Sequence, residues 1–187
     1  MLVLGLAGWG LTTALRPAQP VPARAAAPGV HSVDPATVTA SASSTQHPDG
    51  PISYAVANTL DGDPTTAWNS DGARDGKGPG ITLTYRFAEP VDLAAISVLN
   101  GYQKVRPRPG KLRLDLYPLN ERVHRLRVVT DSGSWNWDLA DSRARQVFTP
   151  AHGSTRTVRL EVTSTYPSSA YPDVALSEVS FIAAAAG

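Results

Sequence analysis

The sequence contains no cysteine among its 187 residues. Without thiols the protein has no disulfide bond, no zinc–thiolate centre and no cysteine nucleophile. It also has almost no net charge, because 17 basic residues face 16 acidic ones. A nucleic-acid-binding protein ordinarily concentrates basic residues on one surface. This balance therefore argues against nucleic acid as a partner.

Patterns that signal catalysis are also scarce. The four histidines, at positions 31, 47, 124 and 152, share no metal-ligand spacing, and no G-x-S-x-G motif or Gly-rich phosphate loop is present. A glycosidase needs two carboxyl groups roughly 5 to 9.5 Å apart. The candidates for such a pair are Asp61, Asp63, Asp71 and Glu178. Because a sequence does not give their separation, it offers no support for an enzyme.

Only one basic stretch stands out, "KVRPRPGK" from Lys104 to Lys111. The stretch is short and is interrupted by prolines, which are typical of turns and loops. This composition favours a solvated loop over a phosphate-binding site.

The one long hydrophobic run lies at the N-terminus, from Met1 to Leu15, and carries no charge. As a helix it would be about 22 Å long, short of the roughly 30 Å hydrocarbon core of a bilayer. It also lacks the basic start of a signal peptide. We expect residues 1–16 to form a hydrophobic helix that is a membrane anchor, the end of a longer transmembrane segment, or an atypical export signal. A Pro/Ala-rich linker follows at 17–33, so the domain would face the outside of the cell membrane, or be secreted if the linker is cleaved.

Beyond this linker, apolar and polar residues alternate with the period of two that is typical of half-buried strands. The pattern is clearest in "ITLTYRF" (Ile81–Phe87) and "TVRLEVTS" (Thr157–Ser164). Further strands are expected at Val38–Ser44, Leu93–Leu99, Arg113–Tyr117, Arg122–Thr130, Ser134–Leu139, Gln146–Thr149 and Val174–Ile182. No long amphipathic helix is evident. Eight or so short strands predict an all-β fold, an antiparallel β-sandwich or barrel.

One polar loop, "NTLDGDPTTAW" from Asn58 to Trp68, has the composition of a metal-binding loop. Calcium prefers carboxylate, carbonyl and hydroxyl oxygens in a tightly turning loop. The loop is not an EF-hand, because the EF-hand ladder of acids and its closing glutamate are missing. A plain Asx turn accounts for the same residues, and both readings remain open from the loop alone.

Four motifs in a fixed order extend this picture: "SASST" (Ser41–Thr45), "NTLDGDPTTAWNSDG" (Asn58–Gly72), "GITLTYRFAEPVDLAAISVLNGY" (Gly80–Tyr102) and "ALSEVSF" (Ala175–Phe181). Together they resemble the discoidin, or coagulation-factor V/VIII type C, superfamily, and within it the NADase-type glycan-binding domain of actinobacterial membrane-anchored proteins. The resemblance covers roughly Asp34 to Phe181. It implies an eight-stranded antiparallel jelly-roll β-sandwich of the galactose-binding-like type at 34–183, with a short tail at 184–187. It also implies glycan binding without catalysis, and it does not imply NAD hydrolysis.

The same resemblance implies a structural calcium ion at the polar loop. The implied ligands are the side chains of Asp61 and Glu178, the carbonyls of Asn58, Asp63 and Ser177, and the carbonyl and hydroxyl of Thr66. Independently, Glu178 lies in an otherwise apolar run, where an unpaired carboxylate is costly. The alternative is that Glu178 only accepts backbone N–H groups from the loop.

Sugar binding requires an exposed aromatic face and a few polar groups around it. The loop residues that could supply these are Asn69, Ser70, Asp71, Asn100, Tyr102, Tyr166 and Tyr171. For the three tyrosines, packing within the loops is the alternative. Trp68 is expected in the core, and Trp135 and Trp137 on the buried face of a strand. A protein- or phospholipid-binding adhesin is the alternative function, although lipid insertion would need exposed Leu, Phe or Trp in loops that are rich in Tyr, Ser and Asn.

Overall fold

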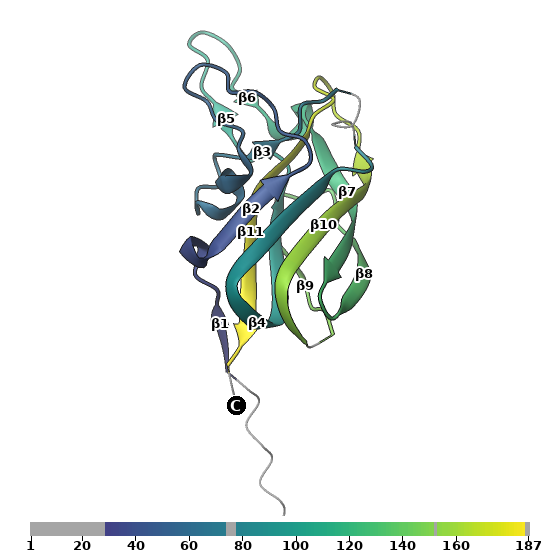
Figure 1. The fold of residues 1–187 in the computed structure, drawn as a ribbon. Helices are drawn as coiled ribbons and strands as arrows, with labels where there is room; N and C mark the ends of the chain where they lie inside the picture. Colours follow the sequence, from purple (N-terminus) through teal and green to yellow (C-terminus); the bar gives the residue numbers. More distant parts are fainter. Residues whose placement is uncertain (1–28, 74–77, 152, 186–187) are drawn as a thin grey trace, which may run out of the picture.

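In the computed structural model, one long strand, β4 (Thr82–Asn100), contributes to both layers of an all-β sandwich (Figure 1). Its first half pairs with β2 (Val38–Ala42) and β10 (Ser154–Tyr166). Its second half pairs with β9 (Gln146–Phe148) and β11 (Val174–Ala184). The two halves meet at an exposed segment, residues 88–90. The strand therefore passes from one layer to the other, and the hydrogen-bonded network is continuous.

The structure describes residues 29–73, 78–151 and 153–185. The hydrophobic helix expected at 1–16 lies outside these residues, as does most of the expected linker. Among the described residues, no helix has the length and apolarity that crossing a bilayer would need.

The remaining strands extend the two layers. On one side β7 (Glu121–Thr130) pairs with β10, and β8 (Gly133–Asp138) pairs with β7. On the other side β1 (Val30–Ser32) and β3 (Trp68–Asn69) both pair with β11. A separate hairpin joins β5 (Val105–Arg106) to β6 (Leu114–Asp115). Short 3-10 helices lie at Pro35–Thr37, Val56–Leu60 and Tyr117–Leu119.

The period-two alternation predicted the main strands correctly, but not their number. The strands expected at 81–87 and 93–99 form the single strand β4, because the residues between them stay extended. The described residues form eleven strands instead of eight. The additional ones, β1, β3 and β5, have two or three residues each, too few for an alternating pattern to be visible. The strand expected at Arg113–Tyr117 is only the two-residue β6, and a 3-10 helix begins at Tyr117.

The core lies between the layers and is filled by the inward residues of the long strands. Phe181 of β11 meets Tyr85 and Phe87 of β4 edge-on, with ring centroids 5.2 and 5.0 Å apart, an arrangement that aromatic pairs favour. Trp68 is fully buried, as predicted, and its indole N–H donates to the Ser44 carbonyl. On the far side Trp137 is buried and stacks on Phe148, whereas Trp135 is half-buried.

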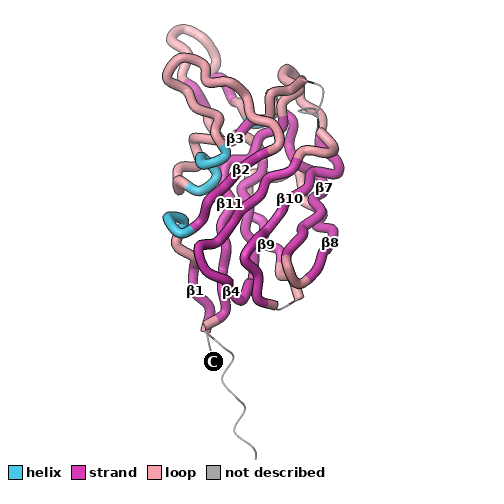
Figure 2. Tube along the Cα trace, viewed as in Figure 1, coloured by secondary structure: helices cyan, strands magenta, loops and turns pink. Residues whose placement is uncertain are grey.

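The long loops gather at one end of the sandwich, and the first and last described strands, β1 and β11, meet at the other (Figure 2). At the loop end, Asn100 joins β4 to β7. Its side-chain amide donates to the Val123 carbonyl at 2.7 Å and accepts from the Val123 N–H at 3.0 Å. The next residue, Gly101, has φ +72°, and a Cβ there would lie 2.7 Å from Arg122 Cγ and from a Tyr117 ring carbon. Only glycine fits this crossing.

We predict that Gly101→Ala destabilises the domain much more than Gly110→Ala. Both glycines have a positive φ, but a Cβ at Gly110 meets nothing within 4 Å. The backbone strain common to both changes should lower the free energy of unfolding by about 1 kcal/mol, and the steric clash at Gly101 should add about 1–3 kcal/mol. Urea unfolding of the two variants measures the difference. Equal losses would show that the crossing at Gly101 tolerates a side chain.

Candidate functional site

A cavity of about 200 Å³ opens at the loop end of the sandwich. Its walls come from segments far apart in the chain, including β3, the β5–β6 hairpin and the residues just before β7 and β11. We call it the tyrosine cavity. It is lined by three tyrosines (Tyr54, Tyr102, Tyr171), two leucines (Leu114, Leu116) and six polar residues (Gln46, Asp49, Asn69, Arg106, Asn120, Asp173).

A buried carboxylate forms the polar wall of the cavity. Asp173 is only 7% exposed, and one of its oxygens, Oδ2, accepts from the amide nitrogens of both Asn69 and Asn120. Because both NH₂ groups are committed to this carboxylate, the orientation of both amides is fixed. Their oxygens are buried and have no hydrogen-bond partner. A buried acceptor without a partner costs about 1–3 kcal/mol, and a hydrogen-bond donor that reached these oxygens would remove this cost.

Three tyrosines form the aromatic wall of the cavity. Tyr102 and Tyr54 are almost completely buried, whereas Tyr171 at the mouth is 48% exposed. Burial raises the pKa of the Tyr102 hydroxyl, and its hydrogen bond with Arg106 acts in the opposite direction. Tyr102 is therefore a neutral phenol that Arg106 holds in place, and Tyr171 is the tyrosine whose ring offers an exposed apolar surface.

The structure brings three of the seven predicted ligand residues to the cavity, namely Asn69, Tyr102 and Tyr171. It does not bring Ser70, Asp71, Asn100 or Tyr166 there. Their polar atoms serve the domain's own backbone. Ser70 Oγ accepts from the Val174 N–H, Asp71 Oδ1 accepts from the Ala73 N–H, and the Tyr166 hydroxyl donates to the Leu139 carbonyl. Asn100 holds β7, as described above. Ser, Asn and Asp side chains in loops can bond to neighbouring backbone groups instead of to a ligand.

Sequence reasoning did not identify Asp173, Asn120, Tyr54 or Arg106 as site residues. The first two have a shared signal, since each stands immediately before a strand. The first residues of β7 and β11 pair in parallel, with Glu121 opposite Val174 and Arg122 opposite Ala175. This pairing places Asn120 and Asp173 side by side. Without knowledge of which strands pair, the two residues look unrelated.

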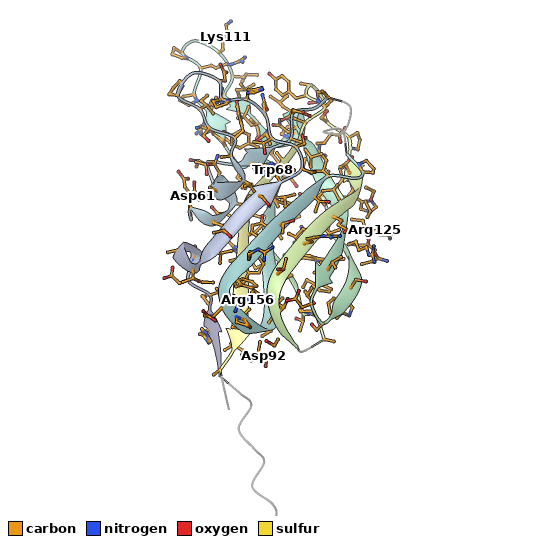
Figure 3. The ribbon with its side chains drawn as sticks, in the orientation of Figure 1. Asp61, Trp68, Asp92, Lys111, Arg125 and Arg156 are labelled. Atoms are coloured by element: carbon orange, nitrogen blue, oxygen red, sulfur yellow. The ribbon has the colours of Figure 1, made fainter. Side chains whose placement is uncertain are left out.

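The polar loop after Asn58 forms a second cluster, on the flank of the sandwich, where Figure 3 shows Asp61. The Thr66 hydroxyl lies 2.8 Å from Asp61 Oδ2 and 3.0 Å from the Asp63 carbonyl oxygen. The Asp63 side chain instead accepts from the Thr65 N–H and hydroxyl, which lowers its pKa. Three of the predicted calcium-ligand atoms therefore lie around one point. Asn58 donates its amide to the Ser53 and Ala67 carbonyls and so closes the loop.

Glu178 faces this loop from β11. It is 5% exposed, and its Oε1 has no hydrogen-bond partner. Burial raises the pKa of Glu178 to about 7, and the nearby Asp61 carboxylate raises it as well, while Arg145 and the Gly62 N–H lower it. The alternative was that Glu178 only accepts backbone N–H groups from the loop. It does accept the Gly62 N–H, but its Oε1 has no partner and Asp61 is close by. These residues fit a calcium ion.

The remaining predicted ligand, Ser177, is fully buried, and its hydroxyl accepts from the Gln103 N–H. Among the residues that the structure describes, no three His, Asp or Glu side chains come together as a metal site. A cation here would therefore depend on carbonyl and hydroxyl oxygens in addition to two carboxylates, which is a donor set that calcium accepts.

Comparisons with known proteins agree on the fold. A family model described as the NAD glycohydrolase translocation F5/8 type C domain matches residues 32–182. No curated protein matches the chain. Among solved structures, the family 32 carbohydrate-binding module of Clostridium perfringens NanJ, in complex with galactose, has a TM-score of 0.60 at 10% identity, over 82% of this chain and 98% of that one.

Two further structures show the same similarity. A C. perfringens CpGH89 CBM32 module in complex with GalNAc-β-1,3-galactose has a TM-score of 0.59 at 13% identity and covers 81% of this chain and 99% of that chain. The arabinofuranosyltransferase AftD from Mycobacteria has a TM-score of 0.59 at 17% identity, over 84% of this chain but 11% of that one. The described residues therefore form an all-β domain similar to the galactose-binding-like fold of CBM32 modules.

We predict that the metal-free domain loses stability as the pH rises from about 5 to 8. The pKa of Glu178 is about 7 in the folded state, above its ordinary value of 4.5. Its stabilising contribution is therefore complete below pH 4.5 and is lost as the pH rises through 7. Thermal melting in chelator across this range measures the loss. Glu178→Gln should remove this component, and Glu89→Gln on the surface should retain it. Identical pH profiles for the wild type and Glu178→Gln would contradict the prediction.

Proposed function

Because the chain belongs to the NAD glycohydrolase translocation F5/8 type C domain family, we propose that it is a carbohydrate-binding module without catalytic activity of its own. The tyrosine cavity is the binding site. The observation that carries the proposal is the pair of unpartnered amide oxygens beside the buried Asp173 carboxylate, in a cavity that tyrosines also line.

A sugar ring matches both walls of this cavity. Its hydroxyl groups donate hydrogen bonds to the oxygens of Asn69, Asn120 and Asp173, and its C–H face packs on an aromatic ring. Tyr171, at the mouth, is the ring that a ligand reaches first. The volume of about 200 Å³ is below the roughly 300–1,000 Å³ of pockets for drug-sized ligands, so the cavity suits one sugar residue rather than several. That two structures with this fold hold galactose or a GalNAc-galactose disaccharide supports the same ligand class.

The cavity is better suited to binding than to acid–base catalysis. Its two carboxylates are Asp49 and Asp173. Asp173 has one oxygen fixed by two amide donors, which holds it as a hydrogen-bond acceptor. Asp49 lies on an exposed loop, and Asp173 is the one buried carboxyl group that lines the cavity.

We also propose a structural calcium ion at the polar loop. The side chains of Asp61 and Glu178, the carbonyls of Asn58, Asp63 and Ser177, and the carbonyl and hydroxyl of Thr66 would hold it. The unpaired Glu178 oxygen beside Asp61 supports this assignment. When bound, the ion would neutralise the two carboxylates and cross-link the loop to β11. Its role would be structural, and it would not contact the ligand in the cavity.

For location, we propose a domain on the outer side of the cell membrane, or secreted if the linker is cleaved. The uncharged apolar run at 1–15 supports this. A site that holds one sugar residue binds weakly, so several copies on one surface would bind a repeating glycan through avidity.

The alternative of a phospholipid-binding domain has one observation in its favour. The loops were expected to lack an exposed large apolar residue, and this expectation was wrong, because Leu112 is 92% exposed.

We expect Tyr171→Ala to weaken glycan binding about tenfold, as loss of a central aromatic contact commonly does. The residue is half-exposed, so its removal should leave the melting temperature unchanged. A glycan array identifies a ligand, and calorimetry with the wild type and the variant gives the ratio of affinities. Asn136→Ala, at an exposed position on β8, is the matched control and should bind normally. If the wild type binds no glycan reproducibly, or if both variants bind as it does, the tyrosine cavity is not a sugar site.

We expect calcium to raise the melting temperature relative to chelator, since a ligand that binds only the folded state stabilises it. Asp61→Asn should abolish the increase, because the side chain of Asp61 would be a ligand. Asp63→Asn should preserve most of it, because Asp63 would contribute its carbonyl and its side chain only caps Thr65. An unchanged midpoint, together with no calcium by elemental analysis of the purified protein, would exclude the ion.

A further inference from the structure

The β5–β6 hairpin carries a concentration of positive charge that the proposed sugar site does not explain. Residues 104–114, which we call the basic hairpin, include five cations and no acid. The cations are Lys104, Arg106, Arg108, Lys111 and Arg113. The whole chain has a net charge of only +1, so this segment differs strongly from the rest. Figure 3 shows Lys111 at its tip, away from the body of the domain.

These charges form no ion pair within the described part of the chain, and Lys104 acts on Asp63 only at longer range, where it helps to lower the pKa of Asp63. None of the five cations forms a salt bridge there, whereas six arginines elsewhere each pair with a carboxylate. Asp115, the acid at the base of the hairpin, is itself taken by Arg143. An uncompensated cluster attracts anions over a distance of about 10 Å at 0.1 M salt.

The hairpin has a fixed place next to the cavity. Val105 pairs with Asp115 and Arg106 with Leu114, and Leu114 packs with Leu116, Tyr54 and Tyr102 in a small apolar cluster. Leu114, Leu116 and Arg106 also line the tyrosine cavity. The base of the hairpin is therefore a wall of the cavity, and a chain that leaves the cavity on this side meets the row of cations.

The groups along this path differ in what they attract. Within the cavity, the amide oxygens beside Asp173 accept hydrogen bonds from neutral hydroxyls, and Asp173 and Asp49 repel an acidic group. Arg106, at the junction with the hairpin, and the cations beyond it attract an acidic group. One ligand can bind both the tyrosine cavity and the basic hairpin if the sugar residue in the cavity is neutral and the neighbouring sugar residues carry the acidic groups.

We propose that the glycan is an acidic polysaccharide that occupies both parts at once. One of its sugar residues binds in the tyrosine cavity, and the carboxylate or sulfate groups of neighbouring residues pair with Arg106, Arg108, Lys111 and Arg113. The inference rests on the proposed function and names its ligand class. A membrane surface fits less well, because it would reach only the tip of the hairpin, where Leu112 is a single exposed apolar side chain, and would leave Arg106 and the cavity unused.

The test compares acidic polymers with their neutral counterparts. The probes are polygalacturonate against its methyl ester, and dextran sulfate against dextran, so the two pairs distinguish carboxylate from sulfate. The hairpin variant is Arg108→Gln/Lys111→Gln/Arg113→Gln, at three exposed positions. The control variant, Arg86→Gln/Arg156→Gln/Arg159→Gln, removes the same charge from exposed positions on the sheets. Binding is measured for the whole protein at two salt concentrations, together with Tyr171→Ala.

We expect at least one acidic polymer to bind about tenfold more tightly than its neutral counterpart, and more weakly at high salt. The hairpin variant should lose about tenfold in affinity, the control variant less than twofold, and Tyr171→Ala should also weaken binding. Equal binding of acidic and neutral polymers, or equal losses in the two charge variants, overturns the inference while the cavity stands as a neutral-sugar site. If Tyr171→Ala binds the acidic polymer normally, the cavity is not engaged, and the two-part site is wrong.

Lipid vesicles provide the remaining comparison. Binding to phosphatidylglycerol–phosphatidylcholine vesicles that Leu112→Ser abolishes, in a protein that binds no acidic polymer, would identify a membrane as the partner and overturn the inference. A protein that binds none of these probes, acidic or neutral, and no glycan on an array would overturn the inference and the proposed function together.

Discussion

The short pairing of β3 with β11 helps to position polar groups of both the tyrosine cavity and the polar loop. Trp68 lies opposite Leu176, and Asn69 lies opposite Ala175. Trp68 is fully buried and its indole is tied to the Ser44 carbonyl, so this register cannot slip without moving a large core residue. The loop that precedes β3 is thereby held against Glu178, and Asn69 is held against Asp173. One two-residue strand, β3, thus anchors both the polar loop and the carboxylate of the tyrosine cavity.

The tyrosine cavity and the polar loop differ in how their buried polar groups are stabilised. In the cavity, two amide nitrogens stabilise the Asp173 carboxylate, and the unsatisfied atoms are neutral oxygens. At the loop, two carboxylates approach each other and burial raises the pKa of Glu178. Neutral acceptors call for a neutral donor such as a hydroxyl, whereas adjacent anions call for a cation. On the proposed assignments, β11 would support a reversible ligand site at its start and a structural ion site at its middle.

Much of this arrangement was predictable from the sequence, and the remainder depended on strand pairing. The alternation in "ITLTYRF" predicted inward Leu83, Tyr85 and Phe87 because it needs only local periodicity. The oxygen-rich loop from Asp61 to Thr66 was recognisable for the same reason, since its ligands are close in the chain. Asn120 and Asp173 are 53 residues apart, and only the parallel start of β7 and β11 brings them together. For Asn100 and Ser70 the sequence was misleading. Both are polar residues that were expected to contact a ligand, and both instead bond to the backbone of neighbouring strands.

The position of the chain ends has a consequence for how such a domain can be combined with others. β1 pairs with the last residues of β11, Val30 opposite Ala184, so both ends of the described chain leave from the pole opposite the loops (Figure 1). A host protein joined at either end, or at both, would lie away from the cavity and the hairpin. The domain can therefore be placed between two segments of a longer polypeptide as an insertion, with its recognition surface still facing outward.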